Sequence, residues 1–340
     1  MQEIQIYNAH CCGEIGDVIV AGNIDLKGNT ILDQSKFLYE DKKLRNFLLN
    51  EPRGGVFKHF NLIVPPNNEN AKAGFIIMEP EDNPPMSGSN SICVATVLLE
   101  KGIIKMEDPI TEFMLEAPGG IIPIKAFIKN NKVKFVEVQN LPSFVDQLEV
   151  KLKTPSYGEI IVSTVFGGDS FVICNASDFN LTIESNNADK FVKISKEIVR
   201  EANISLGFNH PTLPSLNYIS FCQFIEPIKS NDFNQKEGWN TVCIRPGKLD
   251  RSPCGTGTSA RLALMYAKNE IQLNEKFISR SIIGSSFETF ILKEYKKENK
   301  QMIIPSIKGS AFITGEQKLY ISKDDPFPEG YKLNDTWPSS

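Results

Sequence analysis

Residues 87–101 read SGSNSICVATVLLEK, and residues 254–268 read CGTGTSARLALMYAK. Each stretch begins with small residues that suit a helix N-terminus and continues through positions that are mostly apolar. Gly102 and Asn269 then end the two runs. A helix that is apolar on nearly every face must be buried on nearly every face. We therefore expect two buried central helices, over residues 89–101 and 256–268.

The two stretches align with each other at a constant offset of 167 residues, from 87 onto 254. The rest of the chain supplies short β-rich runs such as 133–138, bounded by Pro, Gly and Asn, and amphipathic helical patterns over 35–49 and 188–206. The sequence therefore predicts an α/β (α+β) fold. It has two pseudo-symmetric domains, each a curved sheet around one of the central buried helices.

A chain of 340 residues suits two domains better than a single core. We expect an N-terminal domain over 1–155 and a C-terminal domain over 156–319, with the crossover in the turn-rich stretch 153–158. The segment 320–340 is expected to pack back on the N-terminal domain. The active site is expected in the cleft between the domains, where both central helices begin.

The composition limits the classes of partner. Hydrophobic residues make up 41% of the chain and charged residues 23%, as in ordinary globular proteins rather than disordered ones. The net charge of −4, with Lys and Arg scattered, offers no basic stripe, so we expect no nucleic-acid partner. The start resembles no signal peptide, and no apolar run is long enough for a bilayer. We therefore expect a cytoplasmic protein with no membrane partner.

The cysteines and histidines suggest neither a disulfide framework nor a metal centre. The seven cysteines are odd in number and form no C-x-x-C pair, so free thiols that mostly fill core space are expected. The three histidines lie far apart in sequence and match no metal-binding spacing. We expect neither a metal nor a cofactor.

The helix starts favour chemistry on a small carboxylate. A helix N-terminus offers free N–H groups and a partial positive charge, so two of them meeting would hold such a group. The same dipole lowers the pKa of a thiol, which makes Cys254 a candidate thiolate. If the carboxylate belongs to an amino acid, its α-carbon lies between Ser87 and Cys254. A proton can then leave one face and return to the other, while backbone donors stabilise the developing charge.

Each of these residues also has an ordinary interpretation. Cys254 alone would be a buried inert cysteine, Ser87 a turn serine, and Asp250 part of a surface ion pair. The run 255–258 could be a phosphate loop, but it lacks the lysine of a P-loop. The paired placement at two equivalent helix starts is what favours the functional interpretation.

Residues 250–261, DRSPCGTGTSAR, resemble the second catalytic motif of the proline racemase family at every position. That family also includes hydroxyproline 2-epimerases and trans-3-hydroxy-L-proline dehydratases. Its first motif, usually Met-Cys-Gly-His, is represented by residues 86–89, MSGS. Supporting matches occur at His10, Gly13-Glu14, 51–54, 166–168, 281–284, 325–327 and Gly330. The resemblance implies the fold of diaminopimelate epimerase.

The resemblance also implies roles for individual residues. Cys254 is the retained acid/base cysteine, and Ser87 takes the place of its partner. Asp250 should face the ring amine of a proline or hydroxyproline substrate. The carboxylate should be held by the backbone N–H groups of Gly88, Ser89, Gly255 and Thr256. A homodimer remains an open alternative.

The sequence departs from the family pattern in ways that bear on the activity. A serine hydroxyl is a far weaker acid and base than a thiol, so Ser87 is poorly suited to symmetric racemisation. Ser89 and Gly55 stand where histidines are usual, which changes the pocket for the ring substituent. We therefore place trans-3-hydroxy-L-proline dehydration, giving Δ1-pyrroline-2-carboxylate, first and 4-hydroxyproline 2-epimerisation second, and one protein could do both.

Three other functions stay open at this point. Proline racemase could be the main activity. A thiol hydrolase would need Cys254 beside His10 or His210. A binding protein would hold proline-like ligands without exchanging their α-hydrogen.

Overall fold

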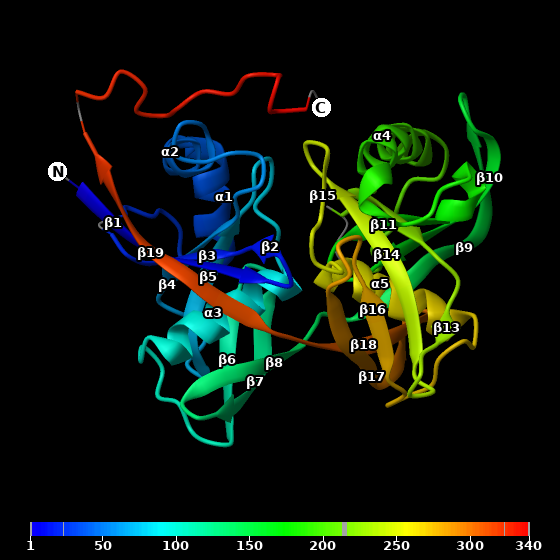
Figure 1. The fold of residues 1–340 in the computed structure, drawn as a ribbon, viewed down its shortest axis with the longest axis horizontal. Helices are drawn as coiled ribbons and strands as arrows, with labels where there is room; N and C mark the ends of the chain where they lie inside the picture. The colour runs from blue at the N-terminus through cyan, green and yellow to red at the C-terminus, as the bar shows by residue number, and fades with distance from the viewer. Residues whose placement is uncertain (1, 23, 213–215, 323, 339–340) are drawn as a thin grey trace. The chain divides into compact units, whose positions relative to one another are not determined.

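The computed structural model describes residues 2–22, 24–212, 216–322 and 324–338 (Figure 1). The chain forms two compact units. Unit 1 comprises Met1–Val138 and Gly309–Ser340, and unit 2 comprises Gln139–Lys308. No helix among the described residues combines the length and apolar character needed to cross a membrane.

Unit 1 is built on a run of paired strands. In pairing order they are β19 (Ala311–Ile321), β1 (Gln2–Cys11), β3 (Asp17–Ala21), β4 (Phe60–Val64), β5 (Ala71–Met78), β6 (Ile110–Ala117), β7 (Gly120–Lys129) and β8 (Lys132–Gln139). The β3–β4 and β5–β6 pairs are parallel, and the other neighbours are antiparallel. The short β2 (Glu14–Ile15) pairs with the end of β1.

Unit 2 repeats this architecture with a later part of the chain. In pairing order its strands are β9 (Ser143–Thr154), β10 (Gly158–Phe166), β11 (Ser170–Asn175), β12 (Phe221–Ile225), β14 (Lys236–Ile244), β16 (Phe277–Arg280), β17 (Ser286–Lys297) and β18 (Lys300–Gly309). β18 also pairs with β9, so the strands of unit 2 form a closed ring. The short β13 (Lys229–Ser230) and β15 (Lys248–Leu249) both pair with β14.

The two units share one order of strand directions. Along each run the neighbours are antiparallel, antiparallel, parallel, antiparallel, parallel, antiparallel and antiparallel. In both units helices make the connections between parallel strands, as a parallel pair requires a crossover. The predicted α/β fold of two pseudo-symmetric domains is therefore confirmed.

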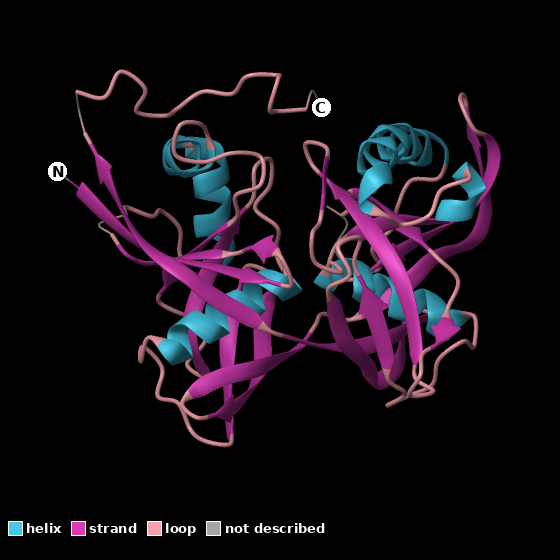
Figure 2. Ribbon diagram, in the orientation of Figure 1, coloured by secondary structure: helices cyan, strands magenta, loops and turns pink. Residues whose placement is uncertain are grey.

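The two predicted central helices are present. α3 (Gly88–Glu100) connects β5 to β6, and α5 (Gly255–Ala267) lies between β14 and β16. Each begins one residue before the expected position, and almost every residue of each is buried. α3 packs against β1, β3, β7 and β19, and α5 against β9, β10 and β11. Figure 2 shows each of these helices lying among strands of its own unit.

The other helices lie in the remaining crossovers. The pattern over 35–49 forms two helices, α1 (Ile31–Asp41) and α2 (Lys43–Leu49), because Lys42 adopts a left-handed conformation with φ of 62°. The pattern over 188–206 forms one helix, α4 (Ala188–Ser205), which follows the 3₁₀ turns η1 (Ala176–Phe179) and η2 (Ser185–Asn187).

The unit boundaries lie after residues 138 and 308, and not after 155 and 319 as the sequence pattern indicates. The stretch 153–158 is not the crossover. It forms the turn of a hairpin inside unit 2, where Gly158 pairs with Thr154 and β9 runs beside β10. At the C-terminal end, Arg53 of unit 1 forms an ion pair with Asp325 and donates hydrogen bonds to the carbonyls of Phe327 and Pro328.

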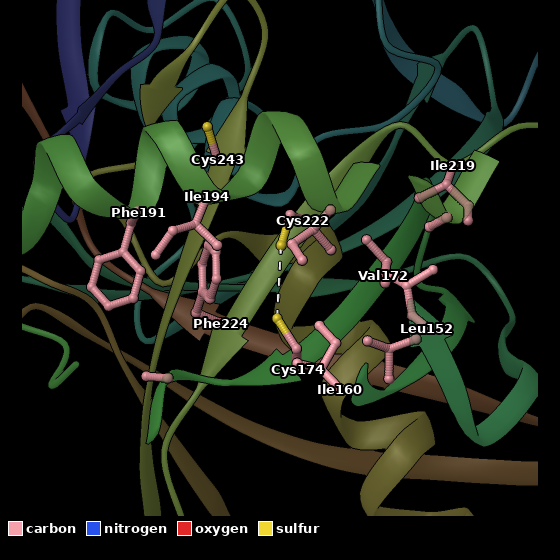
Figure 3. Packing of buried hydrophobic residues seen from close by; sticks show 14 of the residues in the cluster. Leu152, Ile160, Val172, Cys174, Phe191, Ile194, Ile219, Cys222, Phe224 and Cys243 are labelled. Carbon is pink, nitrogen blue, oxygen red and sulfur yellow. Dashed lines mark hydrogen bonds between the residues drawn. The ribbon is translucent and has the colours of Figure 1, made fainter. Parts of the chain in front are cut away.

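All seven cysteines are free thiols, as predicted. Three of them fill the apolar core between α4 and the sheet of unit 2, shown in Figure 3. Cys174 and Cys222 lie with their sulfurs 3.9 Å apart, and Cys243 lies close to α4. Burial raises the pKa of Cys222 well above its usual value. These thiols therefore act as small core residues.

Candidate active site

Ser87 is the N-cap of α3. Its backbone is extended, with φ of −150° and ψ of 123°, and its Oγ accepts a hydrogen bond from the backbone N–H of Asn90 at 3.4 Å. Gly88 and Ser89 follow as the first two helical residues, whose N–H groups have no intrahelical acceptor in any α-helix. Unit 1 thus brings together the three residues predicted from its motif, 87–89, with two backbone donors available to an anion.

Two asparagine side chains form a series of hydrogen bonds that ends at Ser87 Oγ. Asn90 Nδ2 donates to Ser87 Oγ at 2.9 Å. Asn61 Nδ2, on β4, donates to Asn90 Oδ1 at 2.8 Å and to the carbonyl of Asp17 at 3.3 Å. Both asparagines are almost completely buried. Neither was predicted as a site residue. The spacing from 87 to 90 could have indicated Asn90, but Asn61 comes from a strand and carries no local signal.

Cys254 is the N-cap of α5, the position equivalent to Ser87. Its Sγ accepts a hydrogen bond from the backbone N–H of Gly257 at 3.3 Å and lies 3.5 Å from Thr256 Oγ1. The backbone of Cys254 has φ of 60° and ψ of 110°, which is strained for a residue with a side chain. Gly255 and Thr256 again provide two N–H groups without an intrahelical acceptor. Unit 2 thus brings together the residues predicted from its motif.

The segment before Cys254 holds this strained backbone. Asp250 Oδ1 accepts a hydrogen bond from the N–H of Ser252 at 2.8 Å, and Ser252 Oγ accepts one from the N–H of Cys254 at 3.0 Å. Asp250 and Ser252 are both buried. Asp250 is therefore a buried carboxylate and not a surface one. Its carboxylate belongs to the same buried turn as the thiol.

The electrostatic environment of Cys254 corrects one expectation. The helix N-terminus was expected to lower the pKa of this thiol. Instead, burial and the negative charge of Asp250 raise its pKa well above the usual range, and the hydrogen bonds from Thr256 and Gly257 offset this only in part. The side chain is 6% exposed, so desolvation outweighs the dipole. In the substrate-free protein this raised pKa favours the protonated thiol at neutral pH.

A glycine allows close packing against the first turn of each helix. A Cβ on Gly167, in the turn between β10 and β11, would lie 2.1 Å from the carbonyl oxygen of Thr256. A Cβ on Gly16, in the turn between β1 and β3, would lie 2.8 Å from Cys93 Sγ and 3.0 Å from Asn90 Oδ1. The two turns occupy equivalent places in the two units. Backbone from this equivalent turn of each unit therefore packs closely against the start of its central helix.

The histidines take structural positions in their own units. His59 is buried, with its ring nitrogens 3.6 Å from carboxylate oxygens of Glu14 and Glu79. The imidazole of His210 packs edge-on against Phe166. Within the described part of unit 2, the side chain of Cys254 is hydrogen-bonded to Thr256, Gly257 and Asp250.

Comparisons with known proteins identify relatives over nearly the whole chain. A model of the proline racemase family matches residues 6–332. A hydroxyproline epimerase from Agrobacterium vitis, solved with bound trans-4-hydroxy-L-proline, is 34% identical with a TM-score of 0.92, and the match covers 99% of this chain and 96% of that one. A probable proline racemase from Agrobacterium radiobacter, solved with bound carbonate, is 35% identical with a TM-score of 0.90 over 98% of both chains.

More distant structures share the fold alone. A phenazine biosynthesis protein of the PhzF family from Bacillus anthracis is 14% identical, with a TM-score of 0.57 over 94% of this chain and 100% of that one. Methylitaconate-delta-isomerase is 13% identical, with a TM-score of 0.53 over 94% of this chain and 95% of that one. More distant proteins therefore share the overall fold as well.

Proposed function

The chain belongs to the proline racemase family. We propose that it dehydrates trans-3-hydroxy-L-proline and epimerises 4-hydroxyproline at C2, without a cofactor. The family consists of enzymes that remove the α-proton of proline-type substrates. The observation that carries the finer proposal is the pair of helix N-caps, one a thiol at Cys254 and the other a hydroxyl at Ser87. One strong base and one neutral hydroxyl suit an elimination better than a symmetric racemisation.

The substrate carboxylate is bound by the backbone N–H groups at the two helix starts. Gly88 and Ser89 supply two donors from α3, and Gly255 and Thr256 supply two from α5. These donors also stabilise the negative charge that develops on the carboxylate when the α-proton leaves. We assign Cys254 to the α-proton and Ser87 to a hydrogen bond with the substrate.

Asp250 binds the ring ammonium, and this contact activates Cys254. In the free protein the charge of Asp250 helps to raise the pKa of the thiol. An ammonium group paired with Asp250 neutralises that charge, so the thiolate becomes easier to form when substrate is bound. The base is thus generated together with the substrate complex, and a reactive thiolate is not left in the empty protein.

Dehydration then proceeds as an elimination of water. The Cys254 thiolate takes the α-proton and becomes a thiol, while the electron pair of the C–H bond forms the new carbon–carbon double bond. The bond from C3 to the hydroxyl oxygen breaks, and its electron pair leaves on oxygen with Ser87 as hydrogen-bond donor. The departing hydroxide takes up a proton and leaves as water. The enamine tautomerises to Δ1-pyrroline-2-carboxylate, and Cys254 loses its proton to solvent.

Epimerisation of 4-hydroxyproline is the second activity. The relative from Agrobacterium vitis is a hydroxyproline epimerase solved with trans-4-hydroxy-L-proline, which favours this substrate class for the present chain as well. A 4-hydroxyl group is not placed for elimination from the α-carbanion. The only outcome of α-proton removal is then return of a proton to one face or the other.

The proposal is tested by the products of a panel of proline and hydroxyproline isomers, followed by proton NMR in heavy water for wild type, Ser87→Cys and Ser87→Ala. We expect wild type to dehydrate trans-3-hydroxy-L-proline and to epimerise 4-hydroxyproline more slowly. Ser87→Cys places a second thiol at the α3 N-cap, so the ratio of epimerisation to dehydration should rise by about tenfold or more.

Two results would contradict this assignment. Identical product ratios in all three proteins would remove Ser87 from the reaction. Binding of proline-like ligands without any α-deuterium uptake would indicate a binding protein instead of an enzyme.

A further inference from the structure

The amide chain beneath Ser87 has a fixed direction. Asparagine amides can be turned over so that oxygen and nitrogen exchange places, and a neighbour of known polarity decides between the two orientations. The carbonyl oxygen of Asp17 is such a neighbour, because it can only accept. The group of Asn61 that lies 3.3 Å from it must therefore be the Nδ2 amide.

The orientation of the Asn61 amide determines that of the Asn90 amide, and so determines which group of Asn90 faces Ser87. The same Asn61 Nδ2 lies 2.8 Å from the side chain of Asn90, so Asn90 must present its Oδ1 there. Asn90 then presents its Nδ2, a donor, to Ser87 Oγ at 2.9 Å. All the polar atoms on this path come from unit 1. Asn61 and Asn90 are 0% and 1% exposed, so water does not compete for these bonds.

The lone pairs of Ser87 are consequently occupied. Its Oγ accepts from Asn90 Nδ2 and, more weakly, from the backbone N–H of Asn90 at 3.4 Å. A hydroxyl oxygen has two lone pairs and one hydrogen. Ser89 Oγ lies at the same 3.4 Å, a weak contact in which either hydroxyl can donate. The hydrogen of Ser87 is therefore engaged at most weakly, and it can be donated to a substrate oxygen instead.

We infer that Asn61 and Asn90 are positioning residues that hold Ser87 as a hydrogen-bond donor and prevent it from acting as a base. This inference rests on the function proposed above and adds that Ser87 is the donor in its hydrogen bond with the substrate. Cys254 alone takes the α-proton, and Ser87 donates to the oxygen that leaves from C3. Neither asparagine contacts the substrate, and each acts through its neighbour.

Asn90→Asp tests the inference with little change of shape. A carboxylate at this position still accepts from Asn61 but also accepts from Ser87, so the Ser87 hydrogen turns inward. We expect dehydration of trans-3-hydroxy-L-proline to slow by about tenfold or more relative to α-deuterium exchange into the remaining substrate. A purely structural effect would lower both rates together. Asn61→Asp removes the donor to Asn90 and should change the same ratio in the same direction.

A double-mutant cycle separates positioning from general damage. In a Ser87→Ala background, Asn90→Asp should leave the ratio of exchange to dehydration unchanged within about twofold, because the group on which it acts is gone. An equal change of the ratio in both backgrounds would overturn the inference. So would an Asn90→Asp protein with the wild-type ratio.

A second measurement needs no turnover. In protein labelled with ¹⁵N at asparagine, Ser87→Ala should shift one Nδ2 proton resonance of Asn90, while Ser91→Ala, which removes a neighbouring hydroxyl bonded to the Ser87 carbonyl, should shift it less. An unmoved Asn90 resonance in Ser87→Ala would overturn the inference. If the resonance shifts as expected but no substrate exchanges its α-hydrogen, the hydrogen-bond chain stands and the proposed function fails.

Discussion

Cys254 combines a strained backbone with a protonated side chain. Its φ of 60° is held by Ser252, which accepts the Cys254 N–H, and by Asp250, which accepts the Ser252 N–H. The same Asp250 raises the pKa of the thiol that it helps to position. One carboxylate therefore both shapes the turn before Cys254 and raises the pKa of its thiol.

The raised pKa of Cys254 leads to a prediction of how its reactivity depends on pH. Because the pKa of Cys254 is raised, the thiolate fraction in the free protein should stay low near neutrality and increase only at alkaline pH. Asp250→Asn removes the negative charge, so the pKa should fall and alkylation of Cys254 by iodoacetamide at pH 8 should become several-fold faster. The rate is measured by mass spectrometry of the Cys254 peptide.

Asp146→Asn is the matched control for this experiment. Asp146 is a carboxylate of the same unit whose side chain is 6% exposed and is paired with Lys300. It should leave the alkylation rate of Cys254 unchanged. A rate in Asp250→Asn equal to wild type, or a wild-type rate that does not depend on pH between 6 and 10, would show that Asp250 does not control the thiol.

The sequence predicted where the two central helices begin but not the electrostatics of the residues there. Ser87 and Cys254 could be recognised as helix N-caps because small polar residues precede a long apolar run. The positive φ of Cys254 and the raised pKa of its thiol depend on burial and on the position of Asp250 in space. Neither follows from spacing along the chain, and the expectation of a lowered pKa was therefore wrong for the free protein.

The central helices are held by buried polar contacts as well as by apolar packing. Arg261, one turn beyond the first residues of α5, is 1% exposed, and its Nη1 and Nη2 donate to the carbonyls of Trp239 and Glu226 at 2.7 and 2.6 Å. Burial lowers its pKa to about 10, so the side chain is still charged at neutral pH. Arg261 thus connects α5 to strand β14 and to the residue that follows β12.

Arg261→Met should destabilise the protein by about 3 kcal/mol, because two buried carbonyls lose their donors and water cannot replace them. Arg280→Met makes the same change at a more exposed ion pair with Glu237 and should cost less than about 1 kcal/mol. Chemical denaturation of both variants measures the difference. Equal losses would mean that the buried bonds of Arg261 contribute no more than a surface contact.

The existence and burial of α3 and α5 could be predicted because their apolar runs are long. The pattern over 35–49 was harder to interpret, since the break between α1 and α2 depends on one left-handed residue, Lys42. Lysine has no strong preference for that conformation. The fine division of a helical pattern is therefore set by the tertiary structure.

At the level of the whole chain, the repeat of one architecture was predictable and its boundaries were not. The 167-residue offset indicated two similar halves, and the identical order of strand directions confirms them. The boundaries depend on long-range pairing. β19 joins unit 1 because it pairs along the length of β1, and β9 joins unit 2 because it pairs with β10. Local sequence patterns do not encode such partners.

The proposed function depends on removal of the α-proton of a hydroxyproline by Cys254. Wild type, Cys254→Ala and the control Cys243→Ala are incubated with trans-3-hydroxy-L-proline and with trans-4-hydroxy-L-proline in heavy water, and loss of the α-proton signal is followed by NMR. Cys243 is a buried core thiol of the same unit. We expect Cys254→Ala to lose at least about a thousandfold in rate. Cys243→Ala should keep near wild-type exchange, and thermal unfolding should show both variants folded. Exchange in folded Cys254→Ala at more than a few per cent of the wild-type rate would show that Cys254 is not the base that removes the α-proton.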